Sequence, residues 1–226
     1  MQKILFTLFT SCLVFTQLSA LIIEAPNLNR FEETLETIDQ QSLLLFDVDE
    51  TLLIPKDLIL NPYAREAWNQ YAKETIENPE IVPPGKYDDE YFFGQVLSKI
   101  EYKVVDHKVV EIIRSLQRKD IKTIAFTRMP VGSLGVIPSM EDWRIEHLKK
   151  HQFDFSPAFP QFPEIKINVL STGISSLFKQ GMLCANKQDK GPVFTAFLDA
   201  IQWKPSQVVF IDNRLDYLKS VEIVLY

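Results

Sequence analysis

Cysteine, histidine and excess positive charge are all scarce in this chain of 226 residues, which has two cysteines, three histidines and a net charge of −6. Cys12 lies in an N-terminal segment that we expect to be removed, so Cys184 is left without a partner for an internal disulfide. A lone cysteine is typical of a small buried hydrophobic residue. The negative charge gives no electrostatic basis for a nucleic-acid partner.

The scarce histidines also give little support for a zinc site. His147 and His151 lie four residues apart, a spacing that can bind zinc from one face of a helix. No third ligand is near them in the sequence, and lysine and glutamate residues surround them. A solvated helix face is therefore the favoured interpretation.

A hydrophobic run long enough for a comfortable membrane span is missing at the N-terminus. The apolar run from Ile4 to Phe15 is too short for one, but it follows Lys3 and precedes Ser19-Ala20. A basic start, a short apolar core and a small residue at the cleavage site are typical of a secretory signal. We predict a signal peptide over residues 1–20 and a periplasmic or secreted mature protein with no stable membrane span. An uncleaved membrane anchor and a cytosolic chain are the alternatives.

The chain does contain a buried strand that runs directly into acidic residues. Leu43 to Phe46 form a continuous apolar run, which is typical of a strand buried on both faces of a parallel sheet. Asp47 and Asp49 follow, and side chains two apart on a strand share a face. Two carboxylates in one cleft would repel one another and attract a divalent cation. Alone, the pattern is equally compatible with an acidic turn.

Further apolar strands and amphipathic helices predict one α/β domain with a mostly parallel sheet. The expected strands cover residues 43–46, 122–126 and 207–211, and a polar helix is expected over 30–39 before the first of them. Core helices are expected over 104–119, with Val105 on the apolar face, 141–151 and 193–201. Residues 55–103 read as an insertion with helices over 61–72 and 91–100. The later strands also end in polar groups, at Thr127-Arg128 and at Asp212 to Asp216. Because the carboxyl ends of parallel strands line the ligand crevice, these groups are candidates for one site.

These motifs resemble the haloacid dehalogenase superfamily. D-V-D-E-T-L-L from Asp47, behind a signal sequence, is similar to secreted bacterial acid phosphatases, and the arm from Phe178 to Gly181 with Lys190-Gly191 is similar to an uncharacterised bacterial subfamily. The resemblance implies a three-layer, Rossmann-like core over residues 21–226, with a small helical cap insertion at about 55–103. It also implies a magnesium-dependent phosphatase that acts on a small phosphorylated molecule. It implies no oligomeric state.

The resemblance assigns a role to each candidate site residue. Asp47 is the expected nucleophile that forms an aspartyl phosphate, and Asp49 the acid and base for the leaving group and water. Thr127 and Lys190 are expected to bind the phosphate, and Arg128 to bind a second anionic group or to lie on the surface. Lys187 is the alternative to Lys190. The expected Mg²⁺ ligands are Asp47, the backbone carbonyl of Asp49, Asp212 and Asp216.

Two departures from the superfamily pattern leave other functions open. Asn213 follows Asp212 where a second acid is common, and the sequence from Ile223 to Tyr226 reads as a strand at which the chain stops. Both features suit a non-catalytic or degenerate binding protein with the same fold. A phosphotransferase needs only an alcohol acceptor in place of water. Dehalogenation is disfavoured because Asp49 supplies the second aspartate that phosphatases use.

Overall fold

A six-stranded, mostly parallel sheet forms the centre of the molecule. The computed structural model describes residues 22–23, 32–33, 35–57, 65–78, 89–170 and 172–224. The strands are β1 Ser42–Phe46, β4 Lys122–Thr127, β5 Glu164–Asn168, β6 Ser175–Lys179, β7 Met182–Cys184 and β8 Gln207–Ile211, in the order β5-β6-β7-β4-β1-β8. β1 pairs in parallel with β4 and β8, and β4 with β7, whereas β5, β6 and β7 pair antiparallel. The α/β class with a mostly parallel sheet is therefore confirmed.

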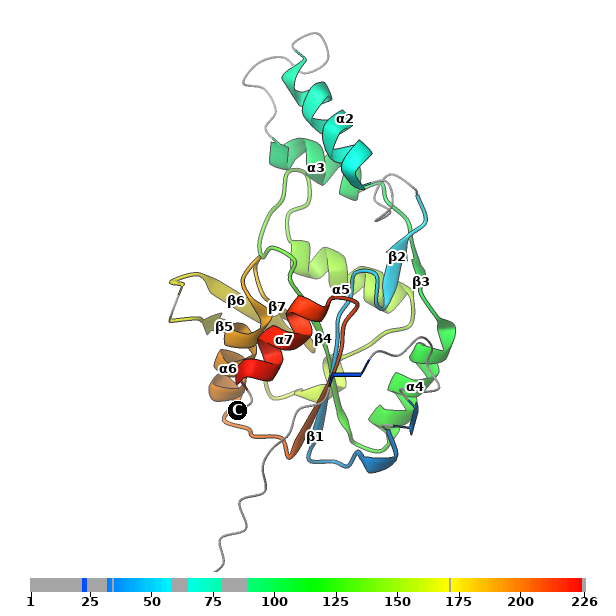
Figure 1. The fold of residues 1–226 in the computed structure, drawn as a ribbon, viewed down its shortest axis with the longest axis vertical. Coiled ribbons are helices and arrows are strands. Elements are labelled where there is room, and N and C mark those ends of the chain that lie inside the picture. Colours follow the sequence, from blue (N-terminus) through cyan, green and yellow to red (C-terminus); the bar gives the residue numbers. More distant parts are fainter. Residues whose placement is uncertain are drawn as a thin grey trace, which may run out of the picture.

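Helices cover both faces of this sheet (Figure 1). The helices are α4 His107–Arg118, α5 Met140–Lys150, α6 Lys190–Ile201 and α7 Leu215–Val224. On β1, Leu44 and Phe46 belong to the hydrophobic cluster that includes α4 and α5. Leu43 and Leu45 belong to the cluster that includes α6 and α7. The continuous apolar run is thus explained by burial on both faces, because alternate side chains enter opposite cores.

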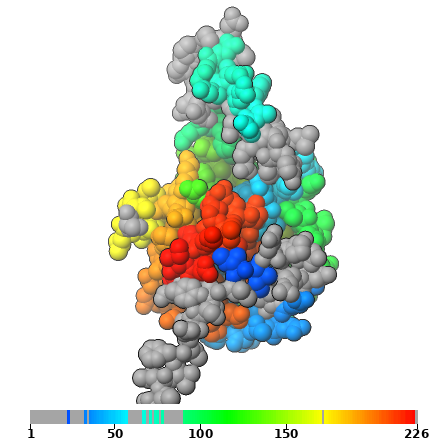
Figure 2. Space-filling model, viewed as in Figure 1, coloured from blue at the N-terminus to red at the C-terminus, as the bar shows by residue number. Residues whose placement is uncertain are grey.

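The chain leaves the sheet after β1 and returns before α4. The short strands β2 Leu53–Pro55 and β3 Tyr102–Val104 pair antiparallel at the base of this excursion. Its helices are α2 Arg65–Glu77 and α3 Asp89–Leu97. They project from the body of the molecule, and α2 forms part of the projecting end (Figures 1 and 2). Residues 58–64 and 79–88 of the predicted insertion lie outside the described residues.

Two glycines let the excursion approach the loop that follows β4. A Cβ on Gly94, in α3, would lie 2.3 Å from the carbonyl oxygen of Leu134. A Cβ on Gly135 would lie 2.6 Å from the carbonyl oxygen of Glu90, and Gly135 has a φ of +55°. Backbone therefore meets backbone at this contact, which glycine alone permits. The contact fixes α3 against the loop that follows β4.

The N-terminal side of the fold departs from two sequence-based boundaries. The helix expected from residue 104 begins at His107, because Asp106 caps it by accepting a hydrogen bond from the Lys108 amide. Val105, expected on its apolar face, precedes the helix and is 48% exposed. Of the helix expected over 30–39, residues 32–33 are helical and Leu35–Thr37 form a 3₁₀ turn, whereas residues 38–39 are not helical. The predicted signal peptide, 1–20, lies outside the described residues, and none of the described helices is long and apolar enough to cross a membrane.

The strand predicted at the C-terminal end is wrong over residues 223 and 224. Both are the last residues of α7, while 225 and 226 lie outside the described residues. α7 packs tightly on α6: a Cβ on Gly191 would lie 2.1 Å from the carbonyl oxygen of Ser220. The Gly191 amide also donates to the Ser220 hydroxyl at 2.9 Å. This helix contact outweighs the strand preference of Ile223 and Val224.

Candidate active site

Asp47 lies where β1 ends, in a nearly closed environment. Its backbone amide continues the sheet by donating to the carbonyl of Ile211 at 2.9 Å. Its side chain is 7% exposed, and Oδ2 accepts a hydrogen bond from the Thr51 hydroxyl at 3.0 Å. The chain turns sharply here, because the amides of Leu52 and Leu53 both donate to the carbonyl of Val48. That turn brings Thr51 back onto the carboxylate.

Lys190 places a buried ammonium between two carboxylates. It is the first residue of α6, and its side chain is fully buried. Nζ donates to Asp47 Oδ1 at 2.6 Å, to Asp212 Oδ2 at 2.7 Å and to the carbonyl of Phe126 at 2.8 Å. All three N–H groups of the ammonium thus have an acceptor. Lys190 rather than Lys187 is the lysine at this site, because Lys187 is exposed.

Burial and crowding of negative charge perturb the acidic groups. Burial raises the pKa of Asp47 against the opposing effect of Lys190, and the neighbouring carboxylates of Asp212 and Asp49 add to the increase, so that the pKa reaches about 7. Burial also raises the pKa of Asp212, again against the effect of Lys190. One ammonium between two buried carboxylates leaves an excess of negative charge. The site therefore favours uptake of a proton or of a further cation.

Asp49 and Thr127 reach the same edge of the sheet. The Asp49 side chain is 50% exposed, and its Oδ2 lies 3.5 Å from the hydroxyl of Thr127. Thr127 is fully buried, and its hydroxyl accepts a hydrogen bond from the Met129 amide at 3.1 Å. The structure thus brings Asp47, Asp49, Thr127, Lys190 and Asp212 together.

Arg128 and Asp216 do not join this cluster. Arg128 Nε donates to the carbonyl oxygens of Lys187 and Gln188, at 3.0 and 3.2 Å, so this residue braces the loop that leads into α6. Asp216 is 60% exposed and accepts two hydrogen bonds from Arg214, at 3.1 and 2.7 Å. Asp216 thus forms a surface ion pair with Arg214, and its role as a metal ligand stays a prediction.

The carboxylates of Asp47 and Asp212 are the kind of ligand that binds magnesium. Mg²⁺ in proteins is commonly held by one or two carboxylates together with substrate phosphate and water. Asp47 and Asp212 both contact the ammonium of Lys190, and their burial keeps water from screening their negative charge. Among the described residues, no group of three or more acidic, histidine or cysteine side chains forms a metal cage. Asn213 donates to the Glu50 carboxylate at 3.0 Å.

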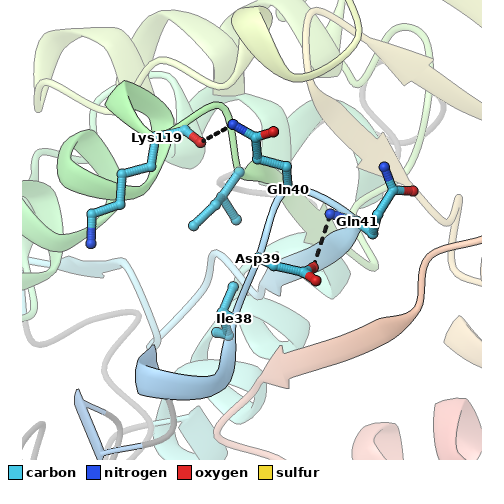
Figure 3. A pocket seen from close by; sticks show the side chains of 6 residues that line it. Ile38, Asp39, Gln40, Gln41 and Lys119 are labelled. Carbon is cyan, nitrogen blue, oxygen red and sulfur yellow. Dashed lines mark hydrogen bonds between the residues drawn. The ribbon is translucent and has the colours of Figure 1, made fainter.

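A hollow of about 420 Å³ lies at the other end of β1 and contains none of these residues. It is lined by Ile38, Asp39, Gln40, Gln41, Lys119 and Ile121. Figure 3 shows Gln40 reaching across it to the carbonyl of Lys119, at 3.3 Å. Because it opens before Ser42 rather than after Phe46, it is separate from the carboxyl edge of the sheet.

Sequence reasoning missed three contributors to the site. Thr51, which donates a hydrogen bond to Asp47, could have been found from the sequence, because it is the threonine of the D-V-D-E-T motif. Tyr217 lies with its ring centre 4.9 Å from Lys190 Nζ, and no sequence pattern marked this tyrosine as part of the site. Arg144 binds Asp49 from α5, within a helix rich in lysine and glutamate that reads as a solvated surface. No pattern around Arg144 distinguishes it from a surface residue.

Fold and site together define an α/β protein with an acidic, lysine-bridged centre at the carboxyl edge of a mostly parallel sheet. The chain belongs to the family described as a protein of unknown function, DUF2608, which matches residues 24–226.

Relatives of this chain occur in Rickettsia, and each is an uncharacterized protein. The one from Rickettsia bellii is 24% identical over 214 residues, covering 90% of this chain and 72% of the relative. The one from Rickettsia prowazekii is 24% identical over 234 residues, covering 96% and 76%. The one from Rickettsia felis is 27% identical over 140 residues, covering 60% and 48%. No solved structure is significantly similar to this chain.

Proposed function

We propose that this chain is an exported, magnesium-dependent phosphatase that hydrolyses small phosphomonoesters through an aspartyl-phosphate intermediate, in the manner of the haloacid dehalogenase superfamily. The observation that carries the proposal is the ammonium of Lys190, held between Asp47 and Asp212 beside Asp49. Phosphoryl transfer needs a positioned nucleophile and fixed positive charge at the phosphate oxygens. Export rests on the signal-like pattern of residues 1–20.

The proposed reaction has two steps. In the first, a carboxylate oxygen of Asp47 bonds to phosphorus as the bond between phosphorus and the ester oxygen breaks, and Asp49 gives its proton to the departing oxygen. In the second, water attacks phosphorus, Asp49 takes a proton from that water, and the bond to Asp47 breaks. Orthophosphate leaves, and both aspartates return to their starting states.

The surrounding groups handle charge. Lys190 neutralises the phosphate oxygens and keeps Asp47 and Asp212 from repelling each other, while Thr127 donates its hydroxyl to a phosphate oxygen. A magnesium ion, when bound by Asp47 and Asp212, would neutralise further charge on the phosphate. Asp47 must be ionised to attack, and its raised pKa of about 7 in the absence of a metal means that a proton and a divalent cation compete for this carboxylate.

The excursion between β2 and β3 is proposed to act as the cap that selects the substrate. Its first strand, β2, begins at Leu53, four residues after Asp49, and α3 is fixed beside the loop after β4 through Gly94 and Gly135. An alcohol in place of water as acceptor would make the same site a phosphotransferase.

Hydrolysis of an aryl phosphate in the presence of Mg²⁺ tests the proposal. We expect the wild-type protein to release phosphate and Asp47→Asn to lose on the order of 10³-fold or more in kcat, because the nucleophile is gone. Asp199→Asn, the same change on the exposed side of α6, is the matched control and should keep wild-type activity. Activity that survives Asp47→Asn would remove Asp47 as nucleophile.

A non-catalytic phosphate-binding protein is the second candidate. The observation that favours it is that Asn213 and Asp216 both engage other partners, which leaves the cation site with fewer acidic groups than the superfamily pattern supplies. The same assay separates the two. A folded wild-type protein that binds inorganic phosphate but hydrolyses no phosphate ester would establish the binding function.

A further inference from the structure

A second buried cation approaches the site from the opposite face of the sheet. The Arg144 side chain, on α5, is 4% exposed, and its Nη2 donates to Asp49 Oδ1 at 2.7 Å. Its Nε and Nη1 are buried and have no hydrogen-bond partner among the described residues. A buried guanidinium normally satisfies most of its donors, because each unpaired donor costs free energy. Its placement therefore requires an explanation beyond ordinary packing.

Aromatic side chains hold the guanidinium where it is. The Arg144 Cζ atom lies 4.9 Å from the ring centre of Tyr102 and 4.8 Å from that of Trp143. The ring of His147 packs against both, with centroid distances of 5.2 and 4.5 Å. Attraction between a cation and aromatic rings strengthens when the cation is desolvated. Arg144 is thus fixed by apolar walls, and Asp49 is its partner for charge.

The contact divides the two oxygens of Asp49 between different neighbours. Oδ1 accepts the hydrogen bond from Arg144, while Oδ2 lies 3.5 Å from the hydroxyl of Thr127. The Asp49 side chain is half exposed and would otherwise be free to rotate towards solvent. Arg144 therefore selects one rotamer of Asp49. In that rotamer, Oδ2 is on the side of Thr127.

We propose that Arg144 is the positioning residue for Asp49. This inference rests on the proposed phosphatase function. With Oδ1 occupied by the guanidinium, Oδ2 is the oxygen that gives its proton to the departing ester oxygen and takes a proton from water. Tyr102, in β3, links this arrangement to the base of the excursion.

Two esters that differ in their need for a general acid test this role. An alkyl phosphate needs a proton for its leaving oxygen, whereas 2,4-dinitrophenyl phosphate has a leaving group that departs without one. We expect Arg144→Met to lower kcat/KM for the alkyl phosphate by about 10²-fold, within the usual range for general acid catalysis. For the dinitrophenyl ester the loss should stay below about tenfold. Asp49→Asn should give the same pattern with a larger loss.

A double variant and a conservative variant sharpen the test. Residues that act as one unit have non-additive effects, so Asp49→Asn combined with Arg144→Met should be no slower than Asp49→Asn alone. Arg144→Lys keeps the charge and one donor, and should recover part of the selective loss. It also carries the test if Arg144→Met does not fold. Arg118→Met, the same change at an exposed position on α4, is the control.

The outcomes separate this inference from the proposed function. A wild-type protein that hydrolyses both esters, with Arg144 variants that lose both equally or not at all, overturns the role of Arg144 alone. Independent losses in the double variant overturn it as well. A folded wild-type protein that hydrolyses neither ester overturns the proposed function and this inference together. A selective, non-additive loss supports it.

Discussion

Lys190 and Arg144 are two buried cations that reach the same end of β1 from helices on opposite faces of the sheet. Lys190 gives all three N–H groups to oxygen acceptors, whereas Arg144 donates to Asp49 through Nη2 and has two buried donors, Nε and Nη1, without a partner among the described residues. Aromatic rings flank both. Lys190 is therefore located by its polar bonds and Arg144 mainly by its apolar surroundings.

The difference also extends to the carboxylates that these cations contact. Asp47 and Asp212 have side chains that are at most 7% exposed, so water cannot replace Lys190 as their partner. The Asp49 side chain is 50% exposed, so water can solvate it if Arg144 is removed. Lys190 is needed to keep two buried charges compatible with the fold. Arg144 orients a group that would be stable without it.

Replacing each cation by methionine should give the largest effect. Lys190→Met leaves Asp47 and Asp212 buried without a counter-ion, and breaking a buried ion pair in this way costs about 3–5 kcal/mol of the free energy of unfolding. Arg144→Met removes one hydrogen bond and two unsatisfied donors, so its cost should be about 1 kcal/mol. Urea unfolding at neutral pH measures both.

Hydrolysis of generic aryl phosphates should also be affected more by Lys190→Met than by Arg144→Met, and Lys190→Met should be inactive. Lys187→Met is the matched control for Lys190, because that lysine lies three residues earlier and is exposed. Equal destabilisation by Lys190→Met and Arg144→Met would contradict the distinction between the two cations.

The acidic partners of Lys190 should also make folding stability depend on pH. The pKa of Asp47 is raised from 3.8 to about 7 in the folded protein. Below 3.8 the carboxyl is protonated in both states, and its contribution to stability is fully present. As the pH rises towards 7 the unfolded state ionises first, so this contribution is lost. Without divalent cations we expect a loss on the order of 2 kcal/mol between about pH 5 and about pH 8.

Asp47→Asn removes the titrating group and should flatten this part of the profile, whereas Asp199→Asn should leave it unchanged. Magnesium should restore stability more at the high-pH end, because carboxylates must be deprotonated to bind a metal. Urea unfolding in buffers with a chelator or with Mg²⁺ measures both effects. A wild-type profile that matches that of Asp47→Asn would contradict the raised pKa.

The fold was predictable where consecutive apolar residues indicate a buried strand. The run from Leu43 to Phe46 specified a strand with two buried faces, and the aspartates after it located the site edge. The last two residues of α7 were not predictable in the same way, because Ile223 and Val224 favour strands and the contact that makes them helical lies on α6, near Gly191. There, packing between segments distant in sequence outweighs the local preference for a strand.

The site was predictable where chemistry and spacing coincide, as in Asp47 and Asp49. Arg144 was not, because its partner Asp49 is 95 residues away and its helix has the composition of a solvated surface. The spacing of Asp216, four residues after Asp212, suggested a second ligand. The exposed turn there instead lets Arg214 reach Asp216 with two hydrogen bonds.

The smallest expected effect belongs to Asp216 and completes the contrast between buried and exposed ion pairs. The pair of Asp216 and Arg214 is exposed on both sides, and such pairs contribute about 0–1 kcal/mol to stability. Asp216→Asn should therefore leave the urea midpoint and the affinity for Mg²⁺ close to wild type. Asp212→Asn, which removes a buried partner of Lys190, should weaken both. Calorimetric titration with Mg²⁺ measures the affinity. A loss of affinity of tenfold or more in Asp216→Asn would contradict this prediction, because it would mean that the Asp216 carboxylate leaves Arg214 and binds the ion.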